Sequence, residues 1–148
     1  MFHSFGLIVG TLLPLCRGIR TTVFPSPLQY RQIPTAVYNS NATMFLSTNT
    51  FLNGYARMAH PYDFRNLRYL LAGAEKVQQA TADTWARKFG VRITEAYGVT
   101  ECSPAISANT KVSNRFGSVG RLLPGSSGSS RQSTAWRMPA VCSFVAPT

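Results

Sequence analysis

Acidic residues are scarce in this sequence of 148 residues. Five Asp and Glu stand against fifteen Lys and Arg, which gives a formal net charge of +10. Such a balance would suit nucleic acid or an anionic membrane surface. The basic residues are scattered, however: Arg87 and Lys88 form the one adjacent pair, and no basic stripe with interleaved aromatics is present. We therefore expect no nucleic-acid partner, and a cationic binder of nucleic acid or membrane surfaces is the weakest alternative.

Cysteine motifs and long apolar runs are also missing. Cys16, Cys102 and Cys142 share no CxxC spacing, which argues against a zinc site or a disulfide framework and favours a reducing compartment. The apolar run at residues 5–16 spans twelve residues, short of the roughly twenty that a transmembrane helix requires. It also lacks the flanks of a signal peptide. We expect a cytoplasmic chain in which this run forms a buried helix ending near Gly18.

Strand-like and helix-like segments alternate along the chain. Gly and Pro separate them, and Asn49 is a candidate helix cap. The expected strands are residues 19–24, 43–46, 67–71 and 91–96, and the expected helices beyond the first are residues 28–38, 49–58 and 76–89. This alternation predicts the α/β class: a partial doubly wound, mainly parallel sheet with helices on both faces. Residues 126–148 are rich in Ser and Gly and have no periodicity, so we expect a disordered or out-of-frame tail.

Two loops follow predicted strands and carry suitable chemistry for a nucleotide with magnesium. In an open parallel sheet, ligands bind beyond the carboxyl ends of the strands. Residues 72–76 form one such loop and residues 97–101 the other. In the second, Gly98 permits a tight turn, Thr100 offers a hydroxyl to phosphate, and Glu101 offers a hard oxygen to Mg²⁺. Tyr97 suits a flat base. Taken singly, each residue is ordinary loop chemistry.

Together, the residues Tyr-Gly-Val-Thr-Glu at 97–101 resemble the signature loop of the AMP-binding acyl-activating (adenylate-forming) superfamily. Further segments resemble the same family in its order: Phe-His-Ser-Phe-Gly at 2–6, Gly-Ala-Glu at 73–75 and Gly-Ser-Val-Gly-Arg at 117–121. The likeness is greatest to the acyl-ACP synthetase part of bacterial bifunctional 2-acylglycerophosphoethanolamine acyltransferase/acyl-ACP synthetases. It is carried by Pro-Ser-Pro-Leu-Gln-Tyr at 25–30, Ala-His-Pro-Tyr-Asp-Phe-Arg at 59–65 and Ala-Gly-Ala-Glu-Lys at 72–76.

The resemblance implies an ATP-dependent long-chain fatty acid ligase that uses ATP/AMP and Mg²⁺. A fatty carboxylate would attack the α-phosphate to give acyl-adenylate, and a thiol of acyl-carrier protein (ACP) or CoA would then accept the acyl group. Thr100 and Glu101 would be catalytic, at the α-phosphate and as the Mg²⁺ ligand. The implied nucleotide contacts are Gly73, Ala74, Glu75, Tyr97, Gly98 and Thr100. His3 and Phe5 would border the acyl pocket; the less favoured alternative for His3 is a core histidine.

Several parts of the family are not found in this sequence. No phosphate loop ending in Lys-Gly precedes His3, no ribose-binding Gly-Asp pair follows, and no C-terminal domain with a catalytic Lys is present. We therefore expect residues 1–125 to be a partial adenylation domain that is inactive alone. The alternative is a non-catalytic module that binds nucleotide or acyl groups. The resemblance is compatible with a parent enzyme located at the inner membrane of a bacterium. Contact with that membrane would be made only by parts of the parent enzyme that are not found in this sequence.

Overall fold

The structure is built around a sheet of short strands. The computed structural model describes residues 3–102 and 104–124. Its sheet has the order β1-β2-β3-β4-β5. The strands are β1 (Met44–Ser47), β2 (Tyr69–Ala72), β3 (Ile93–Tyr97), β4 (Ser107–Ala108) and β5 (Arg121–Leu122). Strands β1, β2 and β3 pair in parallel, whereas β4 and β5 add an antiparallel edge.

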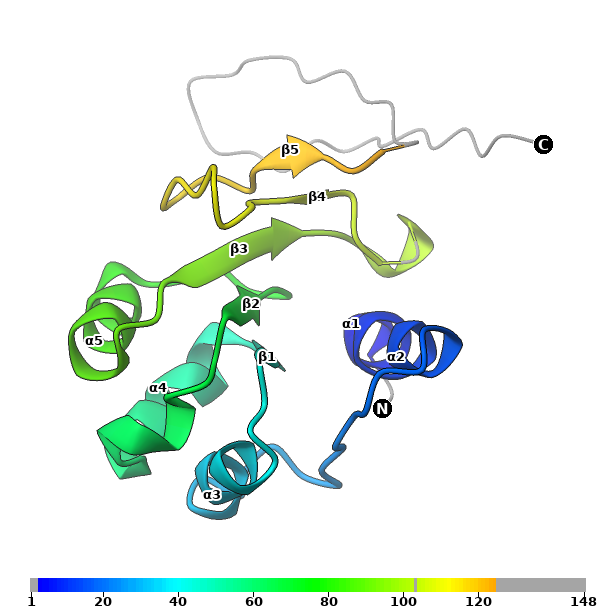
Figure 1. Cartoon of the computed structure of the whole chain (residues 1–148). Helices are drawn as coiled ribbons and strands as arrows, with labels where there is room; N and C mark the ends of the chain where they lie inside the picture. Colours follow the sequence, from blue (N-terminus) through cyan, green and yellow to red (C-terminus); the bar gives the residue numbers. More distant parts are fainter. Residues whose placement is uncertain (1–2, 103, 125–148) are drawn as a thin grey trace.

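Helices lie on both sides of the parallel part (Figure 1). Helices α4 (Asn49–Met58) and α5 (Gln79–Phe89) are the crossovers between successive parallel strands, and α3 (Gln32–Asn39) precedes β1. Because the strand order does not reverse, both crossovers lie on one face. The other face is covered by one helical stretch made of α1 (Ser4–Leu7), the π-helix η1 (Ile8–Leu12) and α2 (Leu13–Cys16). The predicted fold class, mainly parallel with helices on both faces, is confirmed.

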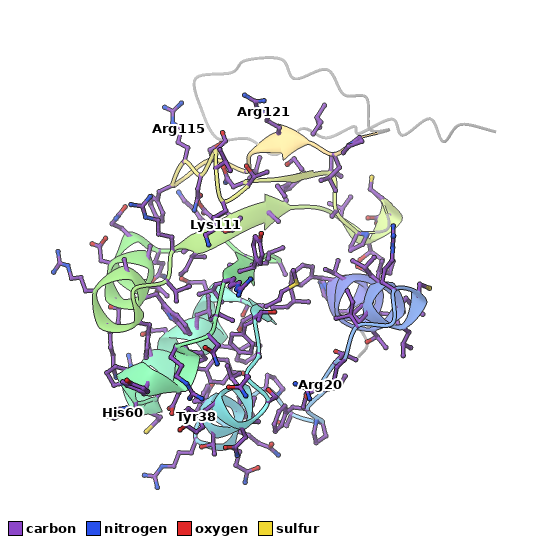
Figure 2. All side chains as sticks on the ribbon, viewed as in Figure 1. Arg20, Tyr38, His60, Lys111, Arg115 and Arg121 are labelled. Atoms are coloured by element: carbon purple, nitrogen blue, oxygen red, sulfur yellow. The ribbon has the colours of Figure 1, made fainter. Side chains whose placement is uncertain are left out.

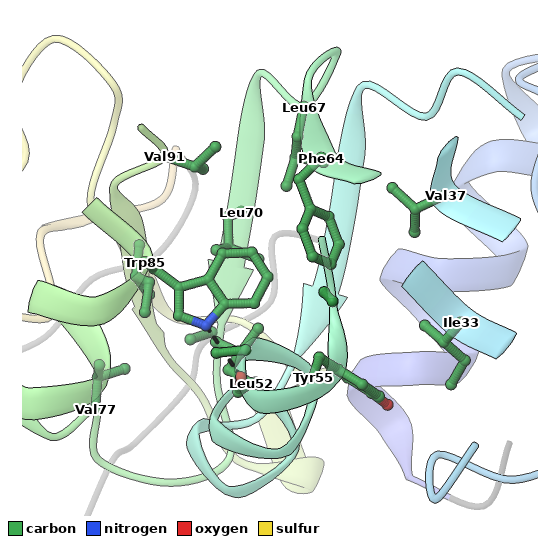
Figure 3. Packing of buried hydrophobic residues seen from close by; sticks show 14 residues of the cluster. Ile33, Val37, Leu52, Tyr55, Phe64, Leu67, Leu70, Val77, Trp85 and Val91 are labelled. Atoms are coloured by element: carbon green, nitrogen blue, oxygen red, sulfur yellow. Dashed lines mark hydrogen bonds between the residues drawn. The ribbon is translucent and has the colours of Figure 1, made fainter. Parts of the chain in front are cut away.

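The core lies between the sheet and the α3–α4–α5 layer. Trp85 of α5 is 0% exposed, and its ring lies 4.7 Å from the ring of Phe64 (Figure 3). The ring of Phe89 lies at the same distance from Trp85. Phe64 ends the 3₁₀ helix η2 (Pro61–Phe64) between α4 and β2. The indole N–H of Trp85 donates to the Leu52 carbonyl at 3.1 Å, so the one polar atom of this side chain is satisfied inside the core.

The N-terminal helix is less buried than its composition predicts. One side meets the sheet: a Cβ added at Gly10 would lie 3.4 Å from Leu46 Cδ1. The other side faces outward, with Leu12 and Leu13 exposed and Leu15 65% exposed. The expected helix is therefore correct, but its expected burial is wrong, because no second layer covers it among the described residues. No helix in this part of the chain is long and apolar enough to span a membrane.

Two local predictions fail for identifiable reasons. Residues 19–24 form no strand, because no neighbouring strand pairs with them, and Ile19 is exposed. Asn49 begins α4 but does not cap it: the N-cap is Thr48, and the Asn49 side chain instead accepts a hydrogen bond from the Gln78 N–H at 3.0 Å. Residues 126–148, the predicted tail, lie outside the described residues.

Candidate functional site

The loops after β2 and β3 lie side by side at the carboxyl ends of neighbouring parallel strands. Between them and the start of α1 is a cavity of about 120 Å³. Its lining comes from four chain segments that are distant in sequence: His3, Ser4, Phe5, Gly73, Ala74, Ala96, Tyr97, Gly98, Val99, Pro104 and Ala105. The fold thus brings together three of the segments on which the family resemblance rests, at the edge where α/β sheets bind ligands.

One wall joins the loop after β2 to α1. Gly73 is buried, and a Cβ added to it would lie 3.6 Å from Phe5 Cζ, so the Phe5 ring packs directly over the glycine. His3 precedes α1 as its N-cap, and its Nδ1 accepts from the Phe5 N–H at 3.3 Å. His3 is exposed and lines the cavity, so the structure gives it a place at the surface of the cavity and not in the core.

The opposite wall is the loop after β3, which folds back on itself. Tyr97 is half-buried, and its carbonyl accepts from the Ile106 N–H at 2.9 Å. At Gly98 an added Cβ would lie 1.6 Å from the Pro104 carbonyl oxygen, so no side chain fits there. The absence of a side chain at Gly98 therefore permits the close return of residues 104–105, which closes the cavity beside Tyr97.

Thr100 and Glu101 lie at the rim of this site. Both belong to the 3₁₀ turn η3 (Thr100–Cys102) and are exposed, and neither is among the lining residues. The Thr100 hydroxyl is 3.3 Å from the Ser4 hydroxyl, which ties η3 to α1 across the mouth. The predicted phosphate and metal residues are thus adjacent to the cavity that contains the predicted base-binding residues.

Glu75 is not among the residues that line the cavity. Its two carboxylate oxygens accept from the backbone N–H and the hydroxyl of Thr50 at 2.7 and 2.9 Å. Partial burial raises the pKa of the Glu75 carboxyl, but hydrogen bonds from Thr48 and Thr50 outweigh this effect and hold the pKa below its usual value. Glu75 therefore lies close to the predicted site while its carboxylate is engaged at the start of α4.

Several residues of this region were not among the predicted site residues. Ser4, Ala96, Val99, Pro104 and Ala105 line the cavity. Glu95, buried on β3, accepts from the Gly117 N–H at 2.7 Å and so anchors the Gly117 segment to the sheet. Ser4 and Val99 adjoin predicted residues and could have been added by proximity. The return of residues 104–105 to the cavity could not be predicted from the sequence, because β4, the strand that follows them, has only two residues and shows no alternation of polar and apolar side chains.

The residues present fit an adenine nucleotide in part. The cavity is smaller than the roughly 300–1,000 Å³ of ordinary ligand pockets, so it suits a flat ring with the ribose and phosphates outside. Among the described residues no group of three or more His, Cys, Asp or Glu could hold a metal ion. One carboxylate beside one hydroxyl suits Mg²⁺ only when phosphate oxygens and water complete its shell, as is usual for nucleotide-bound magnesium.

A second, wider concavity of about 440 Å³ lies at the amino ends of β1 and β2. Its lining includes Asn41, Arg65 and Arg68 and contains no carboxylate. None of the motif residues reaches it. Ligands of open α/β sheets bind at the carboxyl ends of the strands, so the smaller cavity beside Tyr97 is the better candidate site.

Comparison with known proteins places this geometry in a family. A family model described as AMP-binding enzyme matches residues 1–127. The long-chain-fatty-acid–CoA ligase of Yersinia pestis is 32% identical over 131 residues, covering 84% of this chain and 23% of the ligase. The corresponding ligase of Escherichia coli O157:H7 is 27% identical over 127 residues, with the same two shares of 84% and 23%. The chain therefore spans about a quarter of the length of these relatives.

Solved structures show the same fold. A malonyl-CoA ligase with methylmalonyl-CoA and AMP bound has a TM-score of 0.67 and 29% identity, covering 84% of this chain and 28% of that one. An anthranilate CoA ligase in complex with anthranoyl-AMP has a TM-score of 0.74 at 21% identity, covering 84% of this chain and 25% of that one. With the family model matching most of its length, this chain belongs to the family of AMP-binding enzymes.

Proposed function

We propose that this chain forms the adenine-binding part of an ATP-dependent long-chain fatty acid ligase. The observation that carries the proposal is the cavity in which Gly73 and Ala74 lie opposite Tyr97, at the carboxyl ends of neighbouring parallel strands. Membership of the AMP-binding family and the names of the bacterial relatives support the choice of reaction.

Each segment has a role that its position supports. The Gly73–Ala74 backbone and the Tyr97 ring would flank the base. The Thr100 hydroxyl would donate to a phosphate oxygen, and the Glu101 carboxylate would hold Mg²⁺, which supplies neutralising charge at the phosphates. Phe5, packed over Gly73, and His3 would form the acyl side of the cavity. Catalysis in such a site depends on positioning and charge neutralisation.

A comparison of ligands tests the base-binding role. AMP and ribose 5-phosphate carry the same phosphate, so a chain of net charge +10 attracts both alike by electrostatics. Stacking contributes about 1–3 kcal/mol per base, so AMP should bind at least fivefold more tightly than ribose 5-phosphate in a calorimetric or NMR titration. Equal affinity would contradict the proposal, because binding would then depend on the phosphate alone.

We propose that this chain does not catalyse adenylation on its own. The cavity holds only part of a nucleotide, and Thr100 and Glu101 are exposed to water, where their electrostatic effect is weak. We expect no detectable ATP–pyrophosphate exchange with medium- or long-chain fatty acids. Robust exchange that Glu101→Ala abolishes would contradict this expectation and show a competent adenylation site. Nucleotide binding without exchange is therefore the outcome expected of this chain, and it is equally the outcome expected of a non-catalytic binding module.

The acceptor thiol is a finer part of the proposal. The bacterial relatives are named as CoA ligases, whereas the segments at residues 25–30 and 59–65 favour acyl-carrier protein by their resemblance. A chimera would separate the two. Placing this chain in the matching segment of the Yersinia pestis ligase should shift acceptor preference toward acyl-carrier protein, and an unchanged preference for CoA would contradict the ACP assignment.

A further inference from the structure

The wall of the cavity formed by Ala74 has an unusual backbone conformation. Ala74 has φ +67°, one of two residues other than Gly with positive φ among the described part of the chain. A side chain in this left-handed region strains the backbone, and such strain persists only where surrounding contacts enforce it. The Gly73 N–H donates to the Ser47 carbonyl at 3.3 Å and fixes the loop on the strand side. The residues after Ala74 make further contacts that hold the loop on its other side.

Glu75 supplies a constraint from the start of α4. Its carboxylate accepts from the Thr50 N–H at 2.7 Å and from the Thr50 hydroxyl at 2.9 Å. Helix α4 has no acid in its first turn, and its N-cap Thr48 makes no side-chain capping bond to the backbone. A carboxylate 25 residues further along the chain therefore satisfies a free N–H at this helix end and places negative charge at its positive pole.

A second bond runs in the opposite direction across the same contact. The Asn49 side chain, 5% exposed, accepts from the Gln78 N–H at 3.0 Å. Glu75 and Gln78 are thus both bonded to the first turn of α4. Glu75 accepts through its own side chain, whereas Gln78 donates its backbone N–H to the side chain of Asn49. The loop that begins with Gly73 and Ala74 is held at its far end by this pair of bonds.

We propose that Glu75 is a positioning residue that holds Ala74 in its left-handed conformation and so sets the Gly73–Ala74 wall opposite Tyr97. The proposal rests on the proposed function for its consequence in nucleotide binding, but the conformation of the loop is a claim in its own right. Glu75 acts here through the backbone, because its own carboxylate is engaged by Thr50.

Removing the carboxylate separates positioning from electrostatics. If Glu75 acted only by its charge, Glu75→Ala would strengthen the binding of anionic AMP, because one repelling charge would be gone. Positioning predicts the opposite, a loss of about tenfold in AMP affinity, with Glu75→Gln intermediate because an amide oxygen still accepts from Thr50. Asp83→Asn is the matched control: Asp83 accepts from Gln79 on α5 at 2.8 Å and lies outside this contact. Unchanged or tighter AMP binding by Glu75→Ala would overturn the proposal.

A second substitution distinguishes positioning from helix capping. Ala74→Gly removes the penalty of positive φ, so the loop needs less constraint. Glu75→Ala should then cost less than threefold in AMP affinity in the Ala74→Gly background, whereas the drop in unfolding temperature from the lost α4 cap should be the same in both backgrounds. A tenfold loss in both would show that Glu75 only caps α4, and would overturn the positioning claim.

Hydrogen exchange tests the loop independently of nucleotide. Glu75→Ala should accelerate exchange of the Gly73 and Gln78 amides at least tenfold relative to Asp83→Asn, and Ala74→Gly should restore the Gly73 amide in particular. Failure of the unmodified chain to bind AMP would contradict the proposed function alone, with the exchange measurement still deciding the role of Glu75. Unaltered exchange in Glu75→Ala would contradict that role directly.

Discussion

At the residue scale, hydrogen bonds between polar side chains and backbone carbonyls help to specify how the core packs. The Tyr55 hydroxyl donates to the Pro27 carbonyl at 2.7 Å, and the Lys88 ammonium donates to the Ala56 carbonyl at 2.7 Å. Among the described residues no buried side-chain nitrogen or oxygen lacks a partner. Because an unpaired buried polar group costs about 1–3 kcal/mol, each of these bonds discriminates against alternative packings.

Tyr55 gives a stability prediction with a defined pH window. Burial, and to a smaller extent the neighbouring Tyr30, raises the pKa of Tyr55 from 10 to about 12. Below pH 10 Tyr55 is protonated in both states. Between pH 10 and 12 the unfolded state loses the proton more readily, so stability falls as pH rises, by about 2–3 kcal/mol in total.

Tyr55→Phe isolates this contribution from the other groups that titrate in the same range. The variant should lose about 0.5–1.5 kcal/mol at neutral pH, where the bond to Pro27 is missing, and should lose less stability than the parent between pH 10 and 12. Urea unfolding followed by the fluorescence of buried Trp85 measures both effects. Parallel pH curves for the two proteins would contradict the assignment.

At this scale the sequence predicted which segments lie close together, but not which atoms bond to one another. The motif at 97–101 and the strand end before Gly73 predicted neighbouring segments, and Gly73, Tyr97 and Gly98 do line one cavity. Nothing in the sequence indicated that Glu75 would accept from Thr50, 25 residues earlier. Such a bond depends on where two loops meet after folding, which local pattern does not encode.

At the element scale, long periodic segments were predictable and short or unpaired ones were not. Helices α4 and α5 and strands β1, β2 and β3 all lie within three residues of their predicted ranges. Residues 19–24 have strand-like composition yet no strand beside them, and β4 and β5 have two residues each, too few for alternation to show. β-structure requires a partner, so composition alone overpredicts some strands and misses others.

The loop that carries the signature motif depends on Gly98. A Cβ at this position would overlap the Pro104 carbonyl, so Gly98→Ala must displace the 104–105 return. We expect a loss of about 1–3 kcal/mol in stability, typical of overpacking, and weaker AMP binding because Tyr97 adjoins the displaced turn. Urea unfolding and AMP titration measure the two effects.

Gly6→Ala is the matched control for that substitution. Gly6 lies in α1, and an added Cβ would meet nothing within 4 Å. This variant should be neutral or up to about 1 kcal/mol more stable, because Ala favours helix over Gly. Gly98→Ala with the stability and AMP affinity of the control would show that the close return of residues 104–105 is not what shapes the loop.

At the scale of the whole molecule, the positive charge is spread over separate surfaces. Arg115 and Arg121 lie at the β4–β5 edge, whereas Arg20 lies on the segment after α2 (Figure 2). Within the part of the chain that the structure describes, these three arginines therefore do not share one patch. The exposed leucines of α2 favour self-association at high concentration, so binding must be measured on monomeric protein.

The central claim is that the cavity beside Tyr97 binds the adenine of a nucleotide. Titration of monomeric protein with AMP and with ATP, in parallel with Tyr97→Ala, tests it most directly. With the base in the cavity and the phosphates in water, AMP and ATP should bind with similar, millimolar-order dissociation constants, about −4 kcal/mol. Tyr97→Ala should weaken both at least fivefold, from the lost stacking of about 1–3 kcal/mol. Micromolar ATP binding, or binding indifferent to Tyr97, would contradict the assignment.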